Sequence, residues 1–210
     1  MNVLKLTTAT AALLSAMFVA GCGEVSRNGR APAQVVIVLL EGASGAEPDR
    51  FGSTLASDVV TIVERTINDE TVGVPTIYSD IGRVTMRLVL KDPGVPGVAA
   101  TPSPLNTITF NRYRVTYRRA DGRNTPGVDV PFPFDSAATF TVPAESDATV
   151  GFTLVRITAK QEVPLIALTS SPVYIQTIAD VTFYGQDQAG NEVSVSGNIG
   201  ISFGNFGDPQ

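Results

Sequence analysis

The sequence contains no histidine, no tryptophan and a single cysteine, Cys22. Without histidine the chain lacks the commonest general base and the commonest protein ligand of transition metals, and this excludes a Ser–His–Asp or Cys–His catalytic site. A single cysteine excludes an intrachain disulfide and a cysteine-rich zinc site. We therefore expect no cofactor, no metal centre and no catalytic triad.

Charged residues are also scarce, at 17% of the 210 residues, against about 25% in average soluble domains. The formal net charge is −5, which argues against a nucleic-acid partner, because phosphate contacts need clustered Lys and Arg. An acidic chain is equally poor at attracting anionic lipid by charge alone. The abundant glycine and proline, with 19 and 14 residues, favour short strands joined by turns over long helices.

The N-terminal 21 residues are typical of a secretory signal. Lys5 supplies a positive charge, and the apolar stretch at residues 9–20 is too short to cross a bilayer as a helix. The stretch ends in Val19-Ala20-Gly21-Cys22. This sequence resembles the lipobox of bacterial lipoproteins, in which an aliphatic residue and two small residues precede an invariant cysteine.

The resemblance implies cleavage before Cys22, lipid on its thiol and attachment of the mature protein to a membrane. The alternative is an ordinary signal peptide with an incidental cysteine. Gly23 stands where Asp would imply inner-membrane retention, so in a Gram-negative cell the resemblance implies the outer membrane. Residues 22–33 are small, polar and aperiodic, as in a flexible tether. The cell envelope is thus the expected location.

Residues 34–207 are predicted to form one all-β domain, an elaborated sandwich of roughly eight to ten antiparallel strands. The apolar run at residues 35–40 favours a strand that is buried on both faces. Residues 83–91 alternate cleanly between apolar and polar, as in a half-buried strand. The other strands are expected at 55–67 (where a helix is the alternative), 71–78 (interrupted by Pro75), 138–142, 150–160, 173–185 and 192–203.

Two connections lack the pattern of a strand. Residues 92–104 contain four prolines and are expected to form a long loop or a crossing between sheets, with a domain boundary as the alternative. Residues 162–172 contain two prolines and are expected to be irregular, or at most one short helical turn.

The strand expected at residues 107–119 changes phase along its length. Ile108 and Phe110 have one parity, whereas Tyr113, Val115 and Tyr117 have the other. A strict period of two cannot bury both sets on one side of a sheet, so we predict a β-bulge near Asn111-Arg112. The apolar and aromatic side chains then face the core, and the arginines between them face solvent.

The segment 181–203 contains Asp187-Gln188-Ala189-Gly190-Asn191 between two alternating strands. It resembles the closing hairpin of bacterial immunoglobulin-like domains, which implies an immunoglobulin-like sandwich and no particular ligand. We expect the Asp187 carboxylate to cap the turn, with a positive φ at Gly190 or Asn191. The cysteine and tryptophan of antibody domains are absent, and the chain is almost twice as long as one such module of about 100 residues. This length leaves two alternatives, one elaborated sandwich or two abutting modules.

One basic cluster stands out in this acidic chain. Arg112, Arg114 and Arg118 share parity on one predicted strand, with Arg119 and Arg123 nearby. Such a ladder can receive an anionic partner, for example a sugar acid or a phosphate group. The alternative interpretation is cross-strand pairing with neighbouring Asp or Glu on a solvent-facing sheet.

Other chemistries find little support in the sequence. A Ser–Lys pair is open because Lys91 and Lys160 lie in the domain, but no pattern places a serine beside either. Acidic residues such as Asp69, Glu70 and Asp129 are interpreted as solvated turn residues, and the run 187–192 as a turn cap rather than a calcium loop.

The sequence thus predicts a non-catalytic structural or binding module. Its partners would be the membrane, through lipid on Cys22, and an envelope protein or polysaccharide. The alternative is an envelope polysaccharide-active enzyme that uses paired carboxylates.

Overall fold

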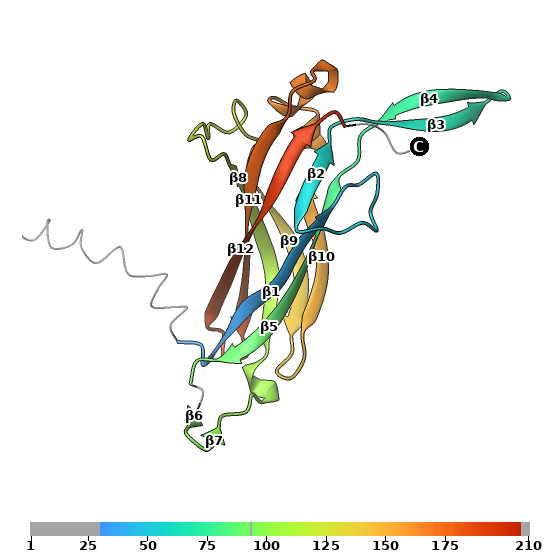
Figure 1. Cartoon of the computed structure of the whole chain (residues 1–210). Helices are drawn as coiled ribbons and strands as arrows, with labels where there is room; N and C mark the ends of the chain where they lie inside the picture. Colours follow the sequence, from blue (N-terminus) through green and yellow to red (C-terminus); the bar gives the residue numbers. More distant parts are fainter. Residues whose placement is uncertain (1–29, 93, 207–210) are drawn as a thin grey trace, which may run out of the picture.

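The computed structural model describes residues 30–92 and 94–206, and most of these residues lie in β-strands. The predicted signal sequence, Cys22 and most of the predicted tether lie outside the described residues. Two sheets share one core cluster of buried apolar side chains (Figure 1). The all-β prediction is confirmed.

The first sheet has three strands and the second has five. The order in the first is β1 (Ala33–Ala43), β5 (Asp80–Leu90), β10 (Ala148–Val155). The order in the second is β2 (Thr54–Asp58), β12 (Glu192–Gly204), β11 (Ile175–Asp187), β8 (Ile108–Arg118), β9 (Phe134–Val142). Neighbours in these two sheets are antiparallel as predicted, except that β2 runs parallel to β12, so the expectation of purely antiparallel pairing is wrong at this edge.

Two small hairpins lie at opposite ends of the sandwich. The first, β3 (Thr61–Ile67) with β4 (Glu70–Thr76), projects from one end, and the second, β6 (Gly94–Val95) with β7 (Val98–Ala99), lies at the other (Figure 1). Pro75 lies in β4 of the projecting β3–β4 hairpin, where each strand has only one neighbour. This position agrees with its expected place near an edge. The connection that contains β6 and β7 joins β5 of the first sheet to β8 of the second, so the predicted crossing between sheets is confirmed.

The helical elements of the described chain are short. They are η1 (Pro104–Asn106), α3 (Ile157–Lys160) and η2 (Leu165–Ser170). Within residues 30–92 and 94–206, no helix is long and apolar enough to cross a membrane.

The predicted bulge in β8 is confirmed. The register of β8 with β9 shifts between Phe110 and Arg112, and the register with β11 shifts at the same point, so Asn111 is the extra residue. The shift restores the phase of the strand. All five of its apolar and aromatic residues are buried: Ile108, Phe110, Tyr113, Val115 and Tyr117.

Phe183 of β11 lies at the centre of the aromatic core. Its ring centroid is 5.3–6.3 Å from those of Phe110, Tyr113, Phe140 and Phe152, which come from three other strands, β8, β9 and β10. Three of these contacts are edge-to-face, an arrangement that aromatic quadrupoles favour. The cluster therefore joins β8, β9 and β11 of the larger sheet to β10 of the smaller one.

The β11–β12 turn is capped as the sequence predicts. Oδ1 of Asp187 accepts hydrogen bonds from the backbone N–H groups of Ala189 and Asn191, and Oδ2 accepts one from the Asn191 side chain. Gly190 takes the positive φ, +79°. Burial tends to raise the pKa of Asp187, but these donors outweigh it and hold the pKa below its ordinary value. The carboxylate is thus committed to the turn.

Two further sequence predictions are wrong. Strand β1 is not buried on both faces, because it is an edge strand whose only neighbour in its sheet is β5, and Val36, Val38 and Leu39 are 37–48% exposed. The strand expected at 150–160 ends at Val155, and α3 follows. Lys160, the last residue of the predicted strand, lies in α3 instead, and its side chain pairs with buried Asp80 of β5.

Candidate functional site

The outer face of the five-stranded sheet carries the arginine ladder, defined here as Arg112, Arg114 and Arg118. Their side chains are 51%, 43% and 47% exposed. Arg112 follows the bulge directly and still projects outward beside Arg114. The predicted orientation of the strand is therefore confirmed, with the aromatic side chains inside and the basic ones outside.

Cross-strand ion pairs hold the ladder. Asp135 of β9 accepts hydrogen bonds from Arg112 at 3.0 Å and from Arg114 at 2.7 Å. Asp180 of β11 binds Arg118 at 2.7 Å. Three guanidinium groups thus share two carboxylates, so the ladder retains one excess positive charge. Arg119 and Arg123 contact Asp121 instead, in the turn beyond β8.

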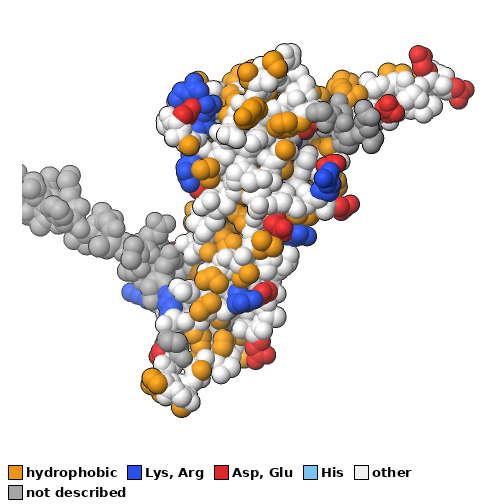
Figure 2. Space-filling view, in the orientation of Figure 1, with side chains coloured by type: hydrophobic (Ala, Val, Ile, Leu, Met, Phe, Trp, Pro, Cys, Tyr) orange, Lys and Arg blue, Asp and Glu red, His pale blue; other side chains and the backbone are white. Residues whose placement is uncertain are grey.

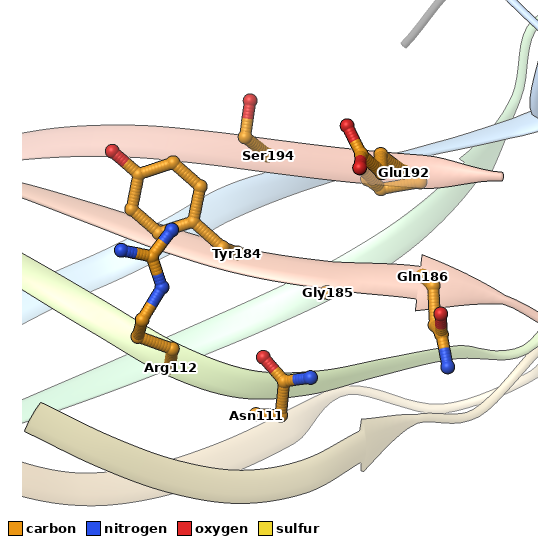
Figure 3. Close-up of a pocket in the computed structure, with 8 residues that line it drawn as sticks. Asn111, Arg112, Tyr184, Gly185, Gln186, Glu192 and Ser194 are labelled. Carbon is orange, nitrogen blue, oxygen red and sulfur yellow. The ribbon is translucent and has the colours of Figure 1, made fainter. Parts of the chain in front are cut away.

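An open groove of about 290 Å³ lies beside Arg112. The Arg112 guanidinium stacks on the ring of Tyr184, 4.2 Å from its centroid. Figure 3 shows the labelled side chains around the groove. They come from β8, β11 and β12 and are Asn111, Arg112, Tyr184, Gln186, Glu192 and Ser194.

The bulge explains why this groove forms here. Asn111 interrupts the regular pairing of β8 with β11 next to Gly185, where an added Cβ would lie 2.3 Å from the carbonyl oxygen of Thr109. The backbones therefore approach closely, and no larger residue fits at this position. The result is a set of amide, hydroxyl, carboxylate and guanidinium groups that can bind a hydroxyl-rich or anionic ligand.

A second hollow, of about 200 Å³, continues from the groove toward the end of the sheet. Its lining is Arg30, Gly190, Asn191 and Glu192, and Glu192 borders both hollows. Sequence reasoning found Arg112 but missed Tyr184 and Gln186. Both residues have the parity of the outward-facing side chains of β11, and the sequence pattern indicates this. The sequence does not indicate that β8, which carries Arg112, is the neighbouring strand.

A buried polar cluster was also missed. Lys160 and Asp80 form an ion pair of 2.8 Å, with side chains 1% and 0% exposed. Ser57 donates to the second oxygen of Asp80 at 2.5 Å, and Lys160 also donates to the backbone oxygen of Asp58 at 2.7 Å. Burial raises the pKa of Asp80, although the Lys160 ammonium opposes this.

The Ser–Lys possibility receives no support from this geometry. Ser57 binds Asp80 rather than Lys160, and the amine is held in an ion pair instead of being free to accept a proton. The cluster joins β2, β5 and α3.

The acidic residues named from the sequence lie on separate elements. Asp69 and Glu70 belong to the β3–β4 hairpin, whereas Asp129 accepts a hydrogen bond from the Thr125 backbone in the turn before β9. Within the described residues, no three His, Cys, Asp or Glu residues gather into a group that could hold a metal ion.

Comparison of the chain with family models, with curated proteins and with solved structures gave no match.

Proposed function

We propose that this protein is a lipid-anchored lipoprotein of the cell envelope, and that its domain is a non-catalytic module that binds an anionic envelope component. The anchor is Cys22, the leader is residues 1–21, and the domain is an elaborated immunoglobulin-like sandwich. In a Gram-negative cell the outer membrane is the proposed location.

The strand order supports the immunoglobulin-like part of this proposal. Constant-type domains place the first, second, fourth and fifth strands in one sheet and the third, sixth and seventh in the other. When the two small hairpins and β2 are set aside, this chain has its first, second and fifth strands (β1, β5 and β10) in one sheet and its third, sixth and seventh (β8, β11 and β12) in the other. The fourth strand, β9, departs from the pattern because it pairs with β8. The β3–β4 and β6–β7 hairpins are insertions that account for much of the extra length.

The outer face of β8 is the observation that carries the binding proposal. A net acidic protein places three half-exposed arginines on one strand, one more than the two carboxylates that pair with them, and a polar groove adjoins them. Arginine binds carboxylates and phosphates through geometrically defined donor pairs. An acidic sugar or phosphorylated glycan fits this chemistry.

The lipid anchor is tested by the substitution Cys22→Ser. Intact mass of the wild-type mature protein should start at Cys22 with added acyl mass, and the variant should leave the membrane fraction. The reason is that two acyl chains anchor a protein stably, at about 0.8 kcal/mol per buried methylene. An unmodified wild-type protein in the soluble fraction would contradict the proposal.

The binding face is tested by the double variant Arg114→Ala/Arg118→Ala. Exposed ion pairs contribute only about 0–1 kcal/mol each, so the thermal unfolding midpoint should stay close to that of the wild type. Binding to purified envelope fragments should fall at least tenfold and lose its salt dependence.

The matched control for this test is Arg87→Ala. Arg87 is also exposed and paired with an aspartate, but it lies on β5 of the other sheet. If the double variant binds envelope fragments as well as Arg87→Ala does, the ladder is only a solvated face of the sheet.

A further inference from the structure

The connection between β5 and β8 is apolar and exposed. No Asp, Glu, Lys or Arg occurs from position 93 to position 107, although charged residues make up 17% of the chain. Within it, the tip loop (defined here as Gly94–Asn106) exposes Val95, Val98 and Leu105 by 66%, 69% and 78%. Hydrophobic and uncharged side chains cover this lower tip in Figure 2, where Figure 1 places β6 and β7.

The tip loop starts at the point where the chain enters the domain from its N-terminal side. The Lys91 backbone N–H, at the root of the connection, donates to the carbonyl oxygen of Pro32 at 3.1 Å. Ala33 pairs with Leu90 at the same end of the first sheet. The first described residue, Arg30, borders the hollow beside the β11–β12 turn. The tip loop, the entering chain and this turn thus share one end of the sandwich.

The reach of the preceding chain fixes which end lies near a lipid on Cys22. Cys22 precedes Arg30 by eight residues, which span at most about 29 Å when fully extended. Strand β11 has 13 residues and runs about 43 Å along the sandwich. A lipid at Cys22 therefore keeps the end with the tip loop within reach of the bilayer, whereas the far end lies beyond the reach of the tether when the domain stands upright.

We propose that the tip loop inserts Val95, Val98 and Leu105 into the interfacial region of the bilayer, as a second membrane attachment beside the lipid. This inference rests on the proposed lipidation of Cys22. The occupant is lipid because the loop carries no charge, its three large apolar side chains project into solvent, and the tether ends at its root. Exposed apolar side chains at such a place gain free energy from burial in the headgroup and acyl boundary.

The insertion also orients the domain. It places the β6–β7 end at the membrane and turns the β3–β4 hairpin away from it (Figure 1). The two attachments together restrict the rotation that a flexible tether alone would permit.

The test uses the full, lipidated chain with an environment-sensitive fluorophore on Val98→Cys. Acylated Cys22 cannot react, so the introduced cysteine is the single labelling site. The matched control is Val128→Cys, because Val128 is 66% exposed and lies in the turn that follows β8 at the opposite end. Both proteins are reconstituted into phosphatidylethanolamine–phosphatidylglycerol vesicles with and without brominated lipid.

We expect brominated lipid to quench the label at position 98 at least threefold and to leave the label at position 128 unchanged. Adding Val95→Asp and Leu105→Asp to the Val98→Cys protein should abolish the quenching without shifting the unfolding midpoint, because both sites are exposed. Equal, water-like emission at both positions in a vesicle-bound protein would overturn the proposal. Shielding at position 98 in native envelopes but not in vesicles would also overturn it, since the occupant would then be a protein.

Failure of the anchor itself is distinguishable from failure of the loop. If Cys22 is not acylated, the wild-type chain does not bind the vesicles and Cys22 reacts with the label. This result overturns both proposals, whereas a bound protein with an unquenched loop overturns only the second.

Discussion

Replacement of Asp80 by alanine should destabilise the domain by about 3–5 kcal/mol, because it leaves the Lys160 ammonium buried without its counter-charge. Lys160 is 1% exposed, and it also donates a hydrogen bond to the carbonyl oxygen of Asp58. Ser57 and the Gly45 backbone N–H would also lose an acceptor. Urea unfolding at neutral pH, followed by far-ultraviolet circular dichroism, measures the change.

The pair's burial makes a second variant informative. Since burial raises the pKa of Asp80, keeping the carboxylate ionised costs free energy in the folded state. Asp80→Leu combined with Lys160→Met removes both charges, and such apolar replacements of buried pairs are often neutral or stabilising. The double variant should therefore be more stable than Asp80→Ala alone.

A surface ion pair supplies the control. Arg87 and Asp147 are 2.7 Å apart, close to the 2.8 Å of the buried pair, but their side chains are 58% and 34% exposed. Asp147→Ala should leave the unfolding midpoint near that of the wild type, because water solvates the remaining arginine. An equal loss of stability in Asp80→Ala and Asp147→Ala would contradict the assignment of burial as the cause.

The success of the sequence predictions depends on how local the determining interactions are. The bulge at Asn111 could be predicted because Ile108, Phe110, Tyr113 and Val115 show the change of parity within a few residues. The cap at Asp187 could be predicted for the same reason, since its donors lie two and four residues away.

The failures come from partners that are distant in sequence. Lys160 ends a run with the pattern of a strand, and its partner Asp80 lies 80 residues away. Nothing near Lys160 indicates that its amine will be buried. Similarly, the apolar run that became β1 does not show that it will lie at an edge, because that depends on which strands pair with it.

The candidate site was predictable only in part for the same reason. The arginine ladder follows from the parity of one strand, and its exposure follows from the cost of burying unpaired guanidinium groups. The groove also needs Tyr184 and Ser194, which come from two other strands. Their position beside Arg112 depends on the register of β8, β11 and β12, which the sequence pattern does not specify.

Phe183→Ala should cost about 3–5 kcal/mol, the range typical of buried phenylalanine truncations. The side chain of Phe183 is fully buried and contacts four other aromatic rings, including Phe152 of the opposite sheet. Truncation therefore removes apolar burial and opens a cavity at the junction of the two sheets. The edge-to-face pairs add about 0.5–1.5 kcal/mol each beyond burial, so the loss should lie toward the upper end of the range.

The lack of tryptophan makes the buried tyrosines useful reporters for this variant. Tyr113 lies 5.8 Å from the Phe183 ring, and its hydroxyl donates to the Thr153 carbonyl of the other sheet. The near-ultraviolet circular dichroism of Phe183→Ala should weaken below the unfolding transition, because Tyr113 gains freedom beside the cavity. Phe132→Ala is the control, since that ring is 47% exposed. If both variants have the same urea midpoint, Phe183 does not join the two sheets energetically, and the stability of the sandwich must come from elsewhere in the core.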